Sequence, residues 1–280
     1  MLSILIPTYN YDCSLLVSEL HTQCTDANIE FEIIVGNDGS TLDLSKLKAL
    51  TSSLKNFRFL DFKENRGRSA IRNILIDESK FNRLLFIDSD MLICKDDYIK
   101  TYLNEDAPMV SGGIEIREEK NPDFILHKKY EKSRSKNIAT TSNLLINKQI
   151  LNEYKFVDLK KYGYEDIIFS FQVSKKYEVK YISNALIHCG AIKTENFIKR
   201  LEDATDVLVY LFNNEEYRED ITKSTKLLRT YLKIKPFRSL FLSCFNLLKP
   251  LIVKQLKSKN PNLYLLDIYK LGLLCKAMKS

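Results

Sequence analysis

A short apolar run that ends in two carboxylates constrains this chain more than any other stretch. Residues 84–87 have the length and composition of a buried strand, and Asp88 and Asp90 follow directly. Because side chains alternate along an extended chain, both carboxylates are expected on one side of the strand end. Two such charges repel each other unless a cation or a set of donors lies between them. An ordinary acidic turn is the alternative explanation for an isolated Asp-x-Asp.

The first ninety residues alternate between strand-like apolar runs and helix-like segments. Strands are expected at residues 3–7, 31–36, 57–62 and 84–87. Strands that alternate with helices form a mostly parallel sheet, and ligands bind at the carboxyl ends of its strands. Pro7 lacks an N–H group and is expected to end the first strand. The sequence therefore predicts an α/β fold with helices flanking the sheet.

Polar motifs follow each of these strands. Pro-Thr-Tyr-Asn occupies residues 7–10, and Asn-Asp-Gly-Ser occupies residues 37–40, where a plain turn is the alternative. After the third strand, Arg68 and Arg72 are spaced to share one face of a helix. Basic residues in the first turns of a helix suit a diphosphate, although a solvated basic face has the same pattern.

Two later segments add titratable groups. Residues 161–169 have the pattern of a loop entering a helix, with Glu165 and Asp166 at the positive end of that helix. A helix cap is the alternative role for this pair. His188 follows a predicted strand at residues 179–187. A lone histidine is more often structural, but imidazole is also a ligand that suits Mn²⁺.

In this order, the motifs resemble the signature of family 2 glycosyltransferases, which are inverting enzymes with the GT-A fold, over roughly residues 1–190. The resemblance implies that Asp90 binds a divalent cation, Mn²⁺ or Mg²⁺, with His188 as second ligand. It implies that Asp166 is the general base, and Glu165 would orient hydroxyl groups beside it. The residues expected to bind the nucleotide sugar are Pro7, Thr8, Tyr9, Asn10, Asp38, Asn65, Gly67, Arg68, Arg72, Asp88, Ser89 and Asp90.

The chemistry of sugar transfer requires the same groups. Charge develops on the leaving diphosphate and is neutralised by a cation, while the attacking acceptor hydroxyl must lose a proton to a base. The resemblance favours a UDP-sugar donor and a hexosyl- or N-acetylhexosaminyltransferase of the bacterial surface-polysaccharide type. The acceptor would be a glycan or a lipid-linked glycan.

Other functions remain open from the sequence alone. A non-catalytic subunit that binds a nucleotide sugar or glycan within a membrane assembly is one alternative, but such a subunit needs no base. A nucleotidyltransferase also uses paired acids, but it usually has a Gly- and Arg-rich loop where this chain has residues 7–10. The absence of Gly-x-Gly-x-x-Gly counts against a nicotinamide enzyme.

Charge is distributed unevenly along the chain. The net charge is +7, yet residues 223–280 contain 13 Lys and Arg against one acid. We therefore expect a GT-A domain at residues 1–222, with a nucleotide-binding half at 1–100 and an acceptor half at 101–222. Residues 223–280 would form a basic amphipathic helical extension.

The extension contains an uncharged apolar run of about ten residues between Arg238 and Lys249. A helix that spans a bilayer needs about 20 residues, so this run is too short to span one. Flanking cations fit a helix that lies in the membrane interface, and a helix packed on the domain is the alternative. Because the cations alternate with aliphatic residues, nucleic acid is not an expected partner.

The N-terminus has no basic start before its apolar run, so no signal peptide is expected. The six cysteines are scattered, with no Cys-x-x-Cys pair, which favours a reducing compartment. These features together predict a cytoplasmic protein that is peripheral on the inner face of the cell membrane.

Overall fold

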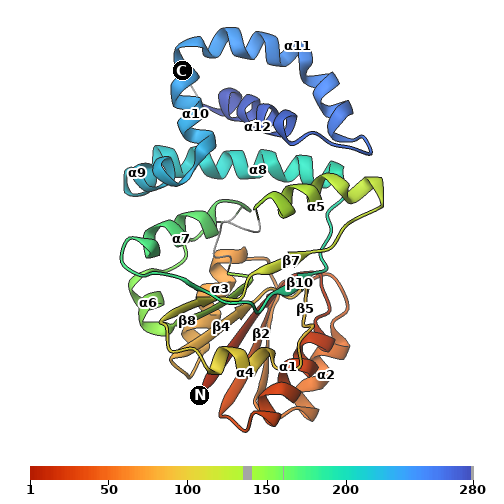
Figure 1. Cartoon of the computed structure of the whole chain (residues 1–280), viewed down its shortest axis with the longest axis vertical. Helices are drawn as coiled ribbons and strands as arrows, with labels where there is room; N and C mark the ends of the chain where they lie inside the picture. Colours follow the sequence, from red (N-terminus) through yellow and green to blue (C-terminus); the bar gives the residue numbers. More distant parts are fainter. Residues whose placement is uncertain (135–140, 160, 279–280) are drawn as a thin grey trace. The chain divides into compact units, whose positions relative to one another are not determined.

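The computed structural model describes residues 1–134, 141–159 and 161–278 (Figure 1). Contacts group the chain into two compact units. The sheet unit holds the described residues of 1–116, 135–160 and 172–190, and the helical unit holds the described residues of 117–134, 161–171 and 191–280. This division does not coincide with the predicted ranges 1–222 and 223–280, because the helices that follow residue 190 group with the C-terminal ones.

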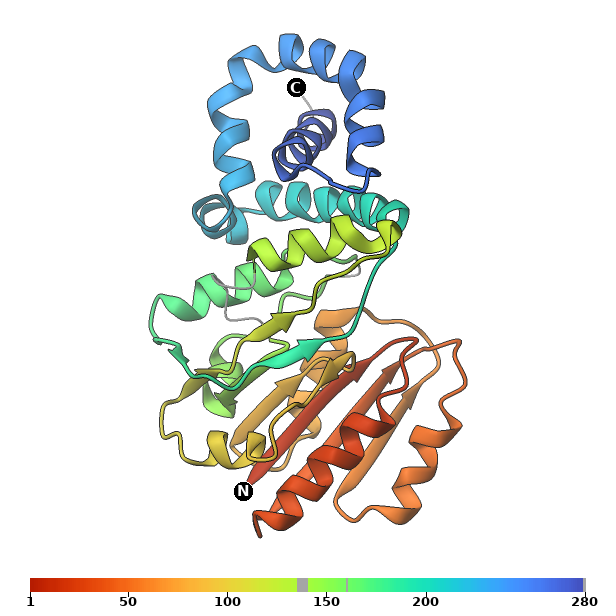
Figure 2. The ribbon, with the colours of Figure 1, turned by 45° about the vertical axis from the view of Figure 1, so that its right-hand side comes forward.

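A seven-stranded sheet forms the centre of the sheet unit (Figure 2). Its order is β3-β2-β1-β4-β8-β6-β9, with β1, β2, β3 and β4 parallel and β8 antiparallel to both β4 and β6. The strands are β1 (Leu2–Thr8), β2 (Phe31–Asp38), β3 (Phe57–Phe62), β4 (Arg83–Ile87), β6 (Met109–Ser111), β8 (Asn143–Asn147) and β9 (Lys180–Tyr181). The predicted α/β architecture with a mostly parallel sheet is confirmed.

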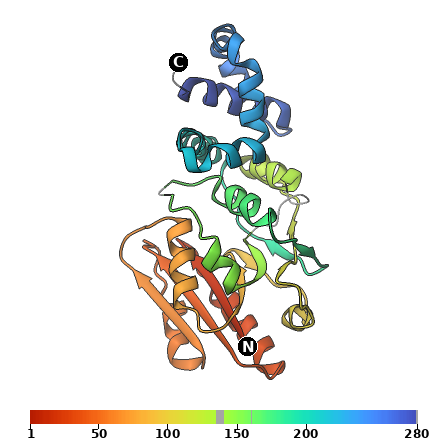
Figure 3. The same ribbon diagram turned by 90° about the vertical axis from the view of Figure 1, so that its left-hand side faces the viewer.

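Helices cover both faces of this sheet (Figure 3). They are α1 (Ser14–Asp26), α2 (Ser45–Ser53), α3 (Arg68–Glu78), α4 (Tyr98–Leu103) and α6 (Lys148–Glu153). Side chains alternate along β1, so Ile4 and Ile6 join the core beneath α1, while α3 packs on the opposite face. Gly36 lets α3 approach closely, since a Cβ there would lie 2.8 Å from Ile71 Cδ1.

Pro7 lies inside β1 and does not end it, contrary to the expectation from the sequence. The strand pairs with β4 only from Ser3 to Leu5, whereas its pairing with β2 continues to Thr8. On the side that faces β4, β1 therefore makes no strand-pairing hydrogen bonds at Pro7. The missing N–H of the proline interrupts none there.

A second, three-stranded sheet lies beyond the end of β4. It consists of β5 (Met91–Leu92), β7 (Ile114–Ile116) and β10 (Leu186–His188), in the order β5-β10-β7. His188 is paired with Met91, so residues about a hundred positions apart in sequence are brought together at this sheet.

Asn143 holds the backbone beside the second sheet. Its side-chain oxygen accepts hydrogen bonds from Tyr98 and Tyr102 at 2.6 and 2.7 Å, and its amide donates to the carbonyls of Gly113 and Asn184. The residue is fully buried, so this polar strand end serves the fold.

The helical unit contains α5 (Pro122–Arg134), α8 (Thr194–Asn213), α9 (Glu215–Ser224), α10 (Lys226–Ile234), the 3₁₀ turn η1 (Lys235–Phe237), α11 (Arg238–Leu256) and α12 (Leu263–Ala277). Helix α7 (Glu165–Ser174) begins in this unit and ends in the sheet unit. The helical unit has its own core, in which Leu126, Phe197, Phe245 and Tyr269 are buried. The helical extension predicted from the sequence is present.

One helical segment among the described residues, Lys226–Leu256, is long and apolar enough to cross a membrane by length and composition alone. The expectation that the C-terminal apolar stretch is too short to span a bilayer is therefore wrong as regards length. It counted only the uncharged run, whereas the helix continues past Lys249.

Candidate active site

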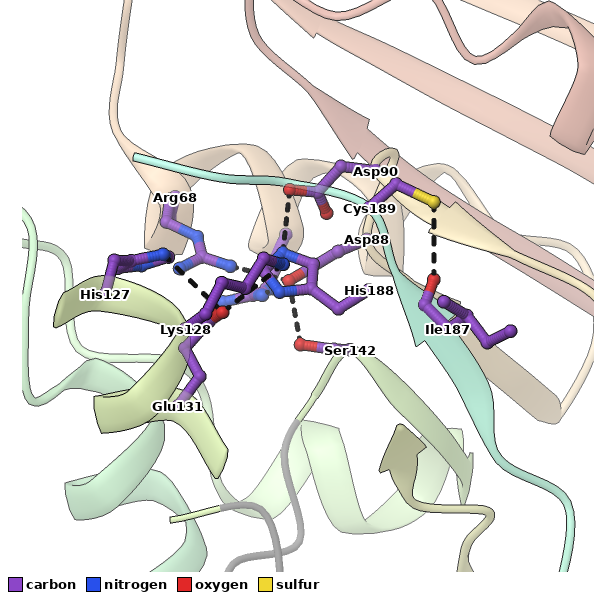
Figure 4. A network of polar contacts seen from close by, with 11 residues as sticks. Arg68, Asp88, Asp90, His127, Lys128, Glu131, Ser142, Ile187, His188 and Cys189 are labelled. Atoms are coloured by element: carbon purple, nitrogen blue, oxygen red, sulfur yellow. Dashed lines mark hydrogen bonds and ion pairs between the residues drawn. The ribbon is translucent and has the colours of Figure 1, made fainter. Parts of the chain in front are cut away.

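Asp88, the residue after β4, is held by three donors (Figure 4). Arg68 Nη2 lies 2.7 Å from Asp88 Oδ2, Arg72 Nη2 lies 2.9 Å from Asp88 Oδ1, and the Ser142 hydroxyl donates to Oδ2 at 2.8 Å. Both arginines come from the first turns of α3 and share one helix face, as their spacing predicts. This cluster joins α3, the end of β4 and the residue before β8.

These neighbours keep the carboxyl group of Asp88 ionised. Burial alone would raise the pKa of Asp88, but the charges of Arg68 and Arg72 and the hydrogen bond from Ser142 outweigh burial and lower its pKa well below the usual range. Arg72 is fully buried, so contact of its guanidinium with a diphosphate would require this pair to open. Asp88 is therefore placed to organise α3 against the sheet.

Asp90 has a different partner. Residues 88–90 form a turn closed by a hydrogen bond from Met91 N to the Asp88 carbonyl, so the alternation of an extended strand does not apply to them. Asp90 Oδ2 lies 2.9 Å from His188 Nε2, and the Asp90 carbonyl accepts from Cys189 N at 2.8 Å. The two acids of the Asp-x-Asp motif are thus used separately.

Gly190 allows the approach of Asp90 to His188. A Cβ on Gly190 would lie 2.1 Å from Asp90 Oδ2 and 2.7 Å from His188 Nε2, far inside van der Waals contact. Any larger residue would displace both side chains. The glycine is one part of the site that the sequence reasoning missed, and its position directly after His-Cys was the available signal.

The Asp90–His188 pair fits a divalent cation. It offers a carboxylate oxygen and an imidazole nitrogen, and the side chains of Asp90 and His188 are 28% and 14% exposed. The described residues contain no group of three or more His, Cys, Asp or Glu side chains arranged for a metal. Two protein ligands completed by substrate phosphates and water are typical of nucleotide-bound Mg²⁺, and the imidazole suits Mn²⁺. The donor set present therefore matches the predicted ion.

The motifs at the carboxyl ends of β1 and β2 contact each other. Asn10 Oδ1 accepts from the backbone N–H groups of Thr41 and Leu42, and Asn10 N donates to the Ser40 hydroxyl at 2.7 Å. The left-handed φ of +53° at Asn10 turns the chain there. Tyr9, by contrast, is 51% exposed and its ring remains available to a ligand.

Asp38 secures the loop that precedes α3. Its two carboxylate oxygens accept from Arg66 N at 2.7 Å and from Gly67 N at 3.0 Å. The neighbouring Gly39 has φ +70°, and a Cβ there would lie 2.6 Å from Asn65 N. Asp38, Asn65 and Gly67, which the sequence placed in the nucleotide site, are therefore brought together.

Three further residues complete this edge of the sheet. The hydroxyl of Thr8 donates to the Tyr11 carbonyl at 2.8 Å, and Ser89 is buried. Tyr11 was not foreseen. Burial raises the pKa of Tyr11, and the charges of Cys189 and Asp90 raise it further.

The Glu165-Asp166 pair lies in the first turn of α7, within the helical unit. Glu165 is buried and its Oε2 accepts from Gly163 N at 3.0 Å, so its carboxylate stabilises the loop that enters the helix. Asp166 is half-buried. A catalytic role for either residue stays a prediction.

A second polar cluster lies on α5 in the helical unit (Figure 4). Helix α5 belongs to a charged stretch at residues 117–137, of which the last three residues lie outside the described ones. Glu131 Oε2 lies 3.5 Å from His127 Nδ1 and 3.6 Å from Lys128 Nζ. Both basic residues are buried, which their sequence context did not indicate.

Comparison with known proteins identifies the family. The model of glycosyl transferase family 2 matches residues 3–170, which is more than half of the chain. The chain belongs to this family.

Curated relatives match over shorter stretches. An uncharacterized glycosyltransferase, YfnE of Bacillus subtilis, is 36% identical over 115 residues, covering 39% of this chain and 29% of the relative. The teichoic acid poly(glycerol phosphate) polymerase of Staphylococcus epidermidis is 33% identical over 96 residues, covering 32% of this chain and 12% of the relative. The alignments thus span less than a third of these longer proteins.

Solved structures match over nearly the whole chain. TarS 1–349 of S. aureus has a TM-score of 0.54 at 16% identity, covering 98% of this chain and 90% of TarS 1–349. A mannosyltransferase of Pyrobaculum calidifontis has a TM-score of 0.56 at 13% identity, covering 99% and 86%. At these identities the likeness concerns the fold, and it confirms the GT-A architecture.

Replacing Asp88 is expected to destabilise the protein. Because buried Arg72 would lose its carboxylate partner, Asp88→Asn should lower the free energy of unfolding by about 3–5 kcal/mol at pH 7, measured by denaturant titration. Folding lowers the pKa of Asp88, so its stabilisation is present above the unfolded value and is lost as pH falls through the folded one. The difference between the two proteins should therefore narrow below about pH 4.

The exposed acid Asp96 provides the control. Asp96→Asn removes the same charge and should change stability by less than about 0.5 kcal/mol. Equal stability of wild type and Asp88→Asn at pH 7 would contradict the anchoring role of Asp88.

Gly190→Ala is expected to disturb the Asp90–His188 pair. The added Cβ would force both side chains apart, so affinity for Mn²⁺ in the presence of UDP should fall by about tenfold or more, measured by electron paramagnetic resonance of free Mn²⁺. Cys189→Ser changes the adjacent side chain, whose sulfur faces the Ile187 carbonyl, and serves as control. Unchanged Mn²⁺ affinity in Gly190→Ala would rule out this pair as the cation site.

Proposed function

We propose that this chain is an inverting, metal-dependent glycosyltransferase that moves a sugar from a nucleotide-diphosphate sugar to a hydroxyl group of a glycan or a lipid-linked acceptor. Membership of glycosyl transferase family 2 supports sugar transfer as the reaction. The observation that carries the metal dependence is the pairing of Asp90 with His188 at the carboxyl end of β4. This edge of a parallel sheet is where ligands bind in α/β folds.

A UDP-sugar is the proposed donor. TarS has been solved in complex with UDP-GlcNAc, and the mannosyltransferase of Pyrobaculum calidifontis in complex with GDP-Man and Mn²⁺. Both neighbours thus support a nucleotide-diphosphate sugar as donor class. Among UDP-sugars, the proposal extends to a hexose or an N-acetylhexosamine as the transferred group.

The residues at the carboxyl ends of β1 and β2 would bind the nucleotide. Asn10 and Asp38 fix the backbone of the surrounding loops, and the exposed ring of Tyr9 is available for stacking on a base. Asp90 and His188 would hold Mn²⁺ or Mg²⁺, which supplies neutralisation of the charge on the leaving diphosphate. Arg68, 38% exposed on the surface of the Asp88 cluster, is the arginine closer to solvent and the better placed for a phosphate.

Asp166 is the proposed general base. A carboxylate that removes the proton of the acceptor hydroxyl makes attack at the anomeric carbon possible, and in-line displacement inverts that centre. Glu165 would assist by holding the loop that presents Asp166, because its own carboxylate is bonded to Gly163 N.

Surface-polysaccharide synthesis is the proposed setting. Relatives include the teichoic acid polymerase and a chondroitin synthase of Escherichia coli, 33% identical over 92 residues, which covers 32% of this chain and 13% of the relative. Both names describe polymer-forming enzymes. We infer a cytoplasmic protein that contacts the inner face of the cell membrane, where lipid-linked acceptors are found.

Asp166→Asn tests the assignment of the base. The amide keeps the size of the carboxylate but cannot accept the proton, so the transfer rate should fall by about 100- to 10,000-fold while UDP affinity stays within about threefold. Rates would be measured as UDP released from UDP-glucose, UDP-galactose, UDP-GlcNAc and UDP-GalNAc with glycan acceptors. Asp158→Asn, at an exposed acid, is the control. Full transfer activity in Asp166→Asn would exclude Asp166 as the base.

A further inference from the structure

Helix α11 is apolar on two faces, and the outward one is exposed. Leu240, Leu247 and Leu251 recur at steps of seven and four residues, the spacing of one helix face, along a helix that contains Pro250 and bends (Figure 1). Their exposed fractions are 67%, 79% and 64%, and the neighbouring Phe237 and Leu248 are 67% and 47% exposed. Scattered exposed leucines are common on soluble proteins, but a continuous stripe of this kind marks an interaction surface. We call these five residues the outer stripe.

The opposite face of α11 packs inside the helical unit. Phe245, Ile252 and Leu256 are buried in a core shared with α12, which lies on the inner side of the bent α11 (Figure 2). Gly272 of α12 admits the Phe245 ring, since a Cβ at Gly272 would lie 2.3 Å from Phe245 Cζ. The core of this unit is therefore complete without the outer stripe.

Cations stand at both ends of the outer stripe. Lys235 precedes Phe237, and Lys254 follows Leu251 by one helical turn; both side chains are exposed. Within residues 223–280, Asp267 is the single acidic residue against 13 Lys and Arg. The stripe thus has an apolar centre and positively charged ends. This pattern complements a surface with an anionic outer layer and an apolar interior.

The charges disfavour a second copy of this chain as the partner. Face-to-face pairing of two outer stripes would bring the lysines of both copies together without compensating acids, at an electrostatic cost. A transmembrane arrangement is disfavoured by packing, because α11 would have to leave α12 and expose Phe245 and Ile252. A helix that lies in the interface keeps these contacts and buries only the outer stripe.

We propose that the outer stripe of α11 docks on the surface of an anionic lipid bilayer. This deepens the location given under the proposed function by naming the surface that makes the contact. The leucines insert at the level of the headgroups, and Lys235 and Lys254 bind the lipid phosphates at either end. Binding does not require the transfer reaction.

The test is flotation of the full chain with vesicles of phosphatidylcholine alone and with phosphatidylglycerol added. Wild type should bind the anionic vesicles and bind neutral ones at least about fivefold more weakly. Leu247→Ser/Leu251→Ser removes apolar area without altering charge and should weaken binding by about tenfold or more. Lys235→Gln/Lys254→Gln should weaken it by about fivefold for each lysine, with a smaller effect at high salt.

Controls separate this proposal from the enzymatic one. Asn246→Ser/Asn213→Ser alters exposed polar residues of the same unit and should bind vesicles like wild type. All variants should retain wild-type affinity for UDP with Mn²⁺, which reports on the sheet unit independently. Should UDP fail to bind any of them, wild type included, while vesicle binding follows the pattern above, only the enzymatic proposal fails.

Three results would overturn the docking surface. Equal binding of Leu247→Ser/Leu251→Ser and wild type to anionic vesicles would show that the stripe is not used. Resistance of bound protein to extraction by alkaline carbonate would indicate a spanning helix. A wild-type dimer that becomes monomeric in the leucine variant, without vesicle binding by either protein, would assign the stripe to a second copy.

Discussion

The ion-pair cluster around Asp88 is the interaction on which the rest of the site depends. It brings Arg68 and Arg72 of α3, together with Ser142, the residue before β8, to the carboxyl end of β4. A buried charge of this kind is costly unless it is fully compensated, and the two guanidinium groups and the hydroxyl provide that compensation. Asp88 is occupied in this way, and the turn that follows β4 presents Asp90 to a different partner.

That partner is supplied by the second sheet. Pairing of β10 with β5 sets His188 opposite Met91, and Gly190 removes the Cβ that would otherwise separate Asp90 from His188. The buried network of Asn143 holds the neighbouring backbone in place. The Asp88 cluster therefore fixes the end of β4, and the pairing of β10 with β5 fixes His188. The two proposed cation ligands meet without a third His, Cys, Asp or Glu side chain among the described residues.

Local sequence patterns predicted the strands, the polar motifs at their ends and the helical spacing of Arg68 and Arg72, because these depend on near neighbours in the chain. They did not predict that Arg72 would be buried on Asp88, or that Pro7 would stay inside β1, since the first depends on the packing of α3 on β4 and the second on where β1 stops pairing with β4. The partnership of Asp90 with His188 spans 98 residues and was suggested by family resemblance rather than by spacing. The grouping of α8 with the C-terminal helices likewise arises from tertiary packing.

Calorimetric titration of wild type and Asp90→Ala with UDP, GDP and CDP, each with and without Mn²⁺, measures whether a cation at Asp90 and His188 strengthens nucleotide binding. We expect Mn²⁺ to strengthen UDP binding to wild type by about tenfold or more, and this gain to disappear in Asp90→Ala. Equal UDP affinity with and without Mn²⁺, or a gain that persists in Asp90→Ala, would contradict a cation site at Asp90 and His188. A manganese-dependent preference for GDP or CDP would contradict the proposed donor.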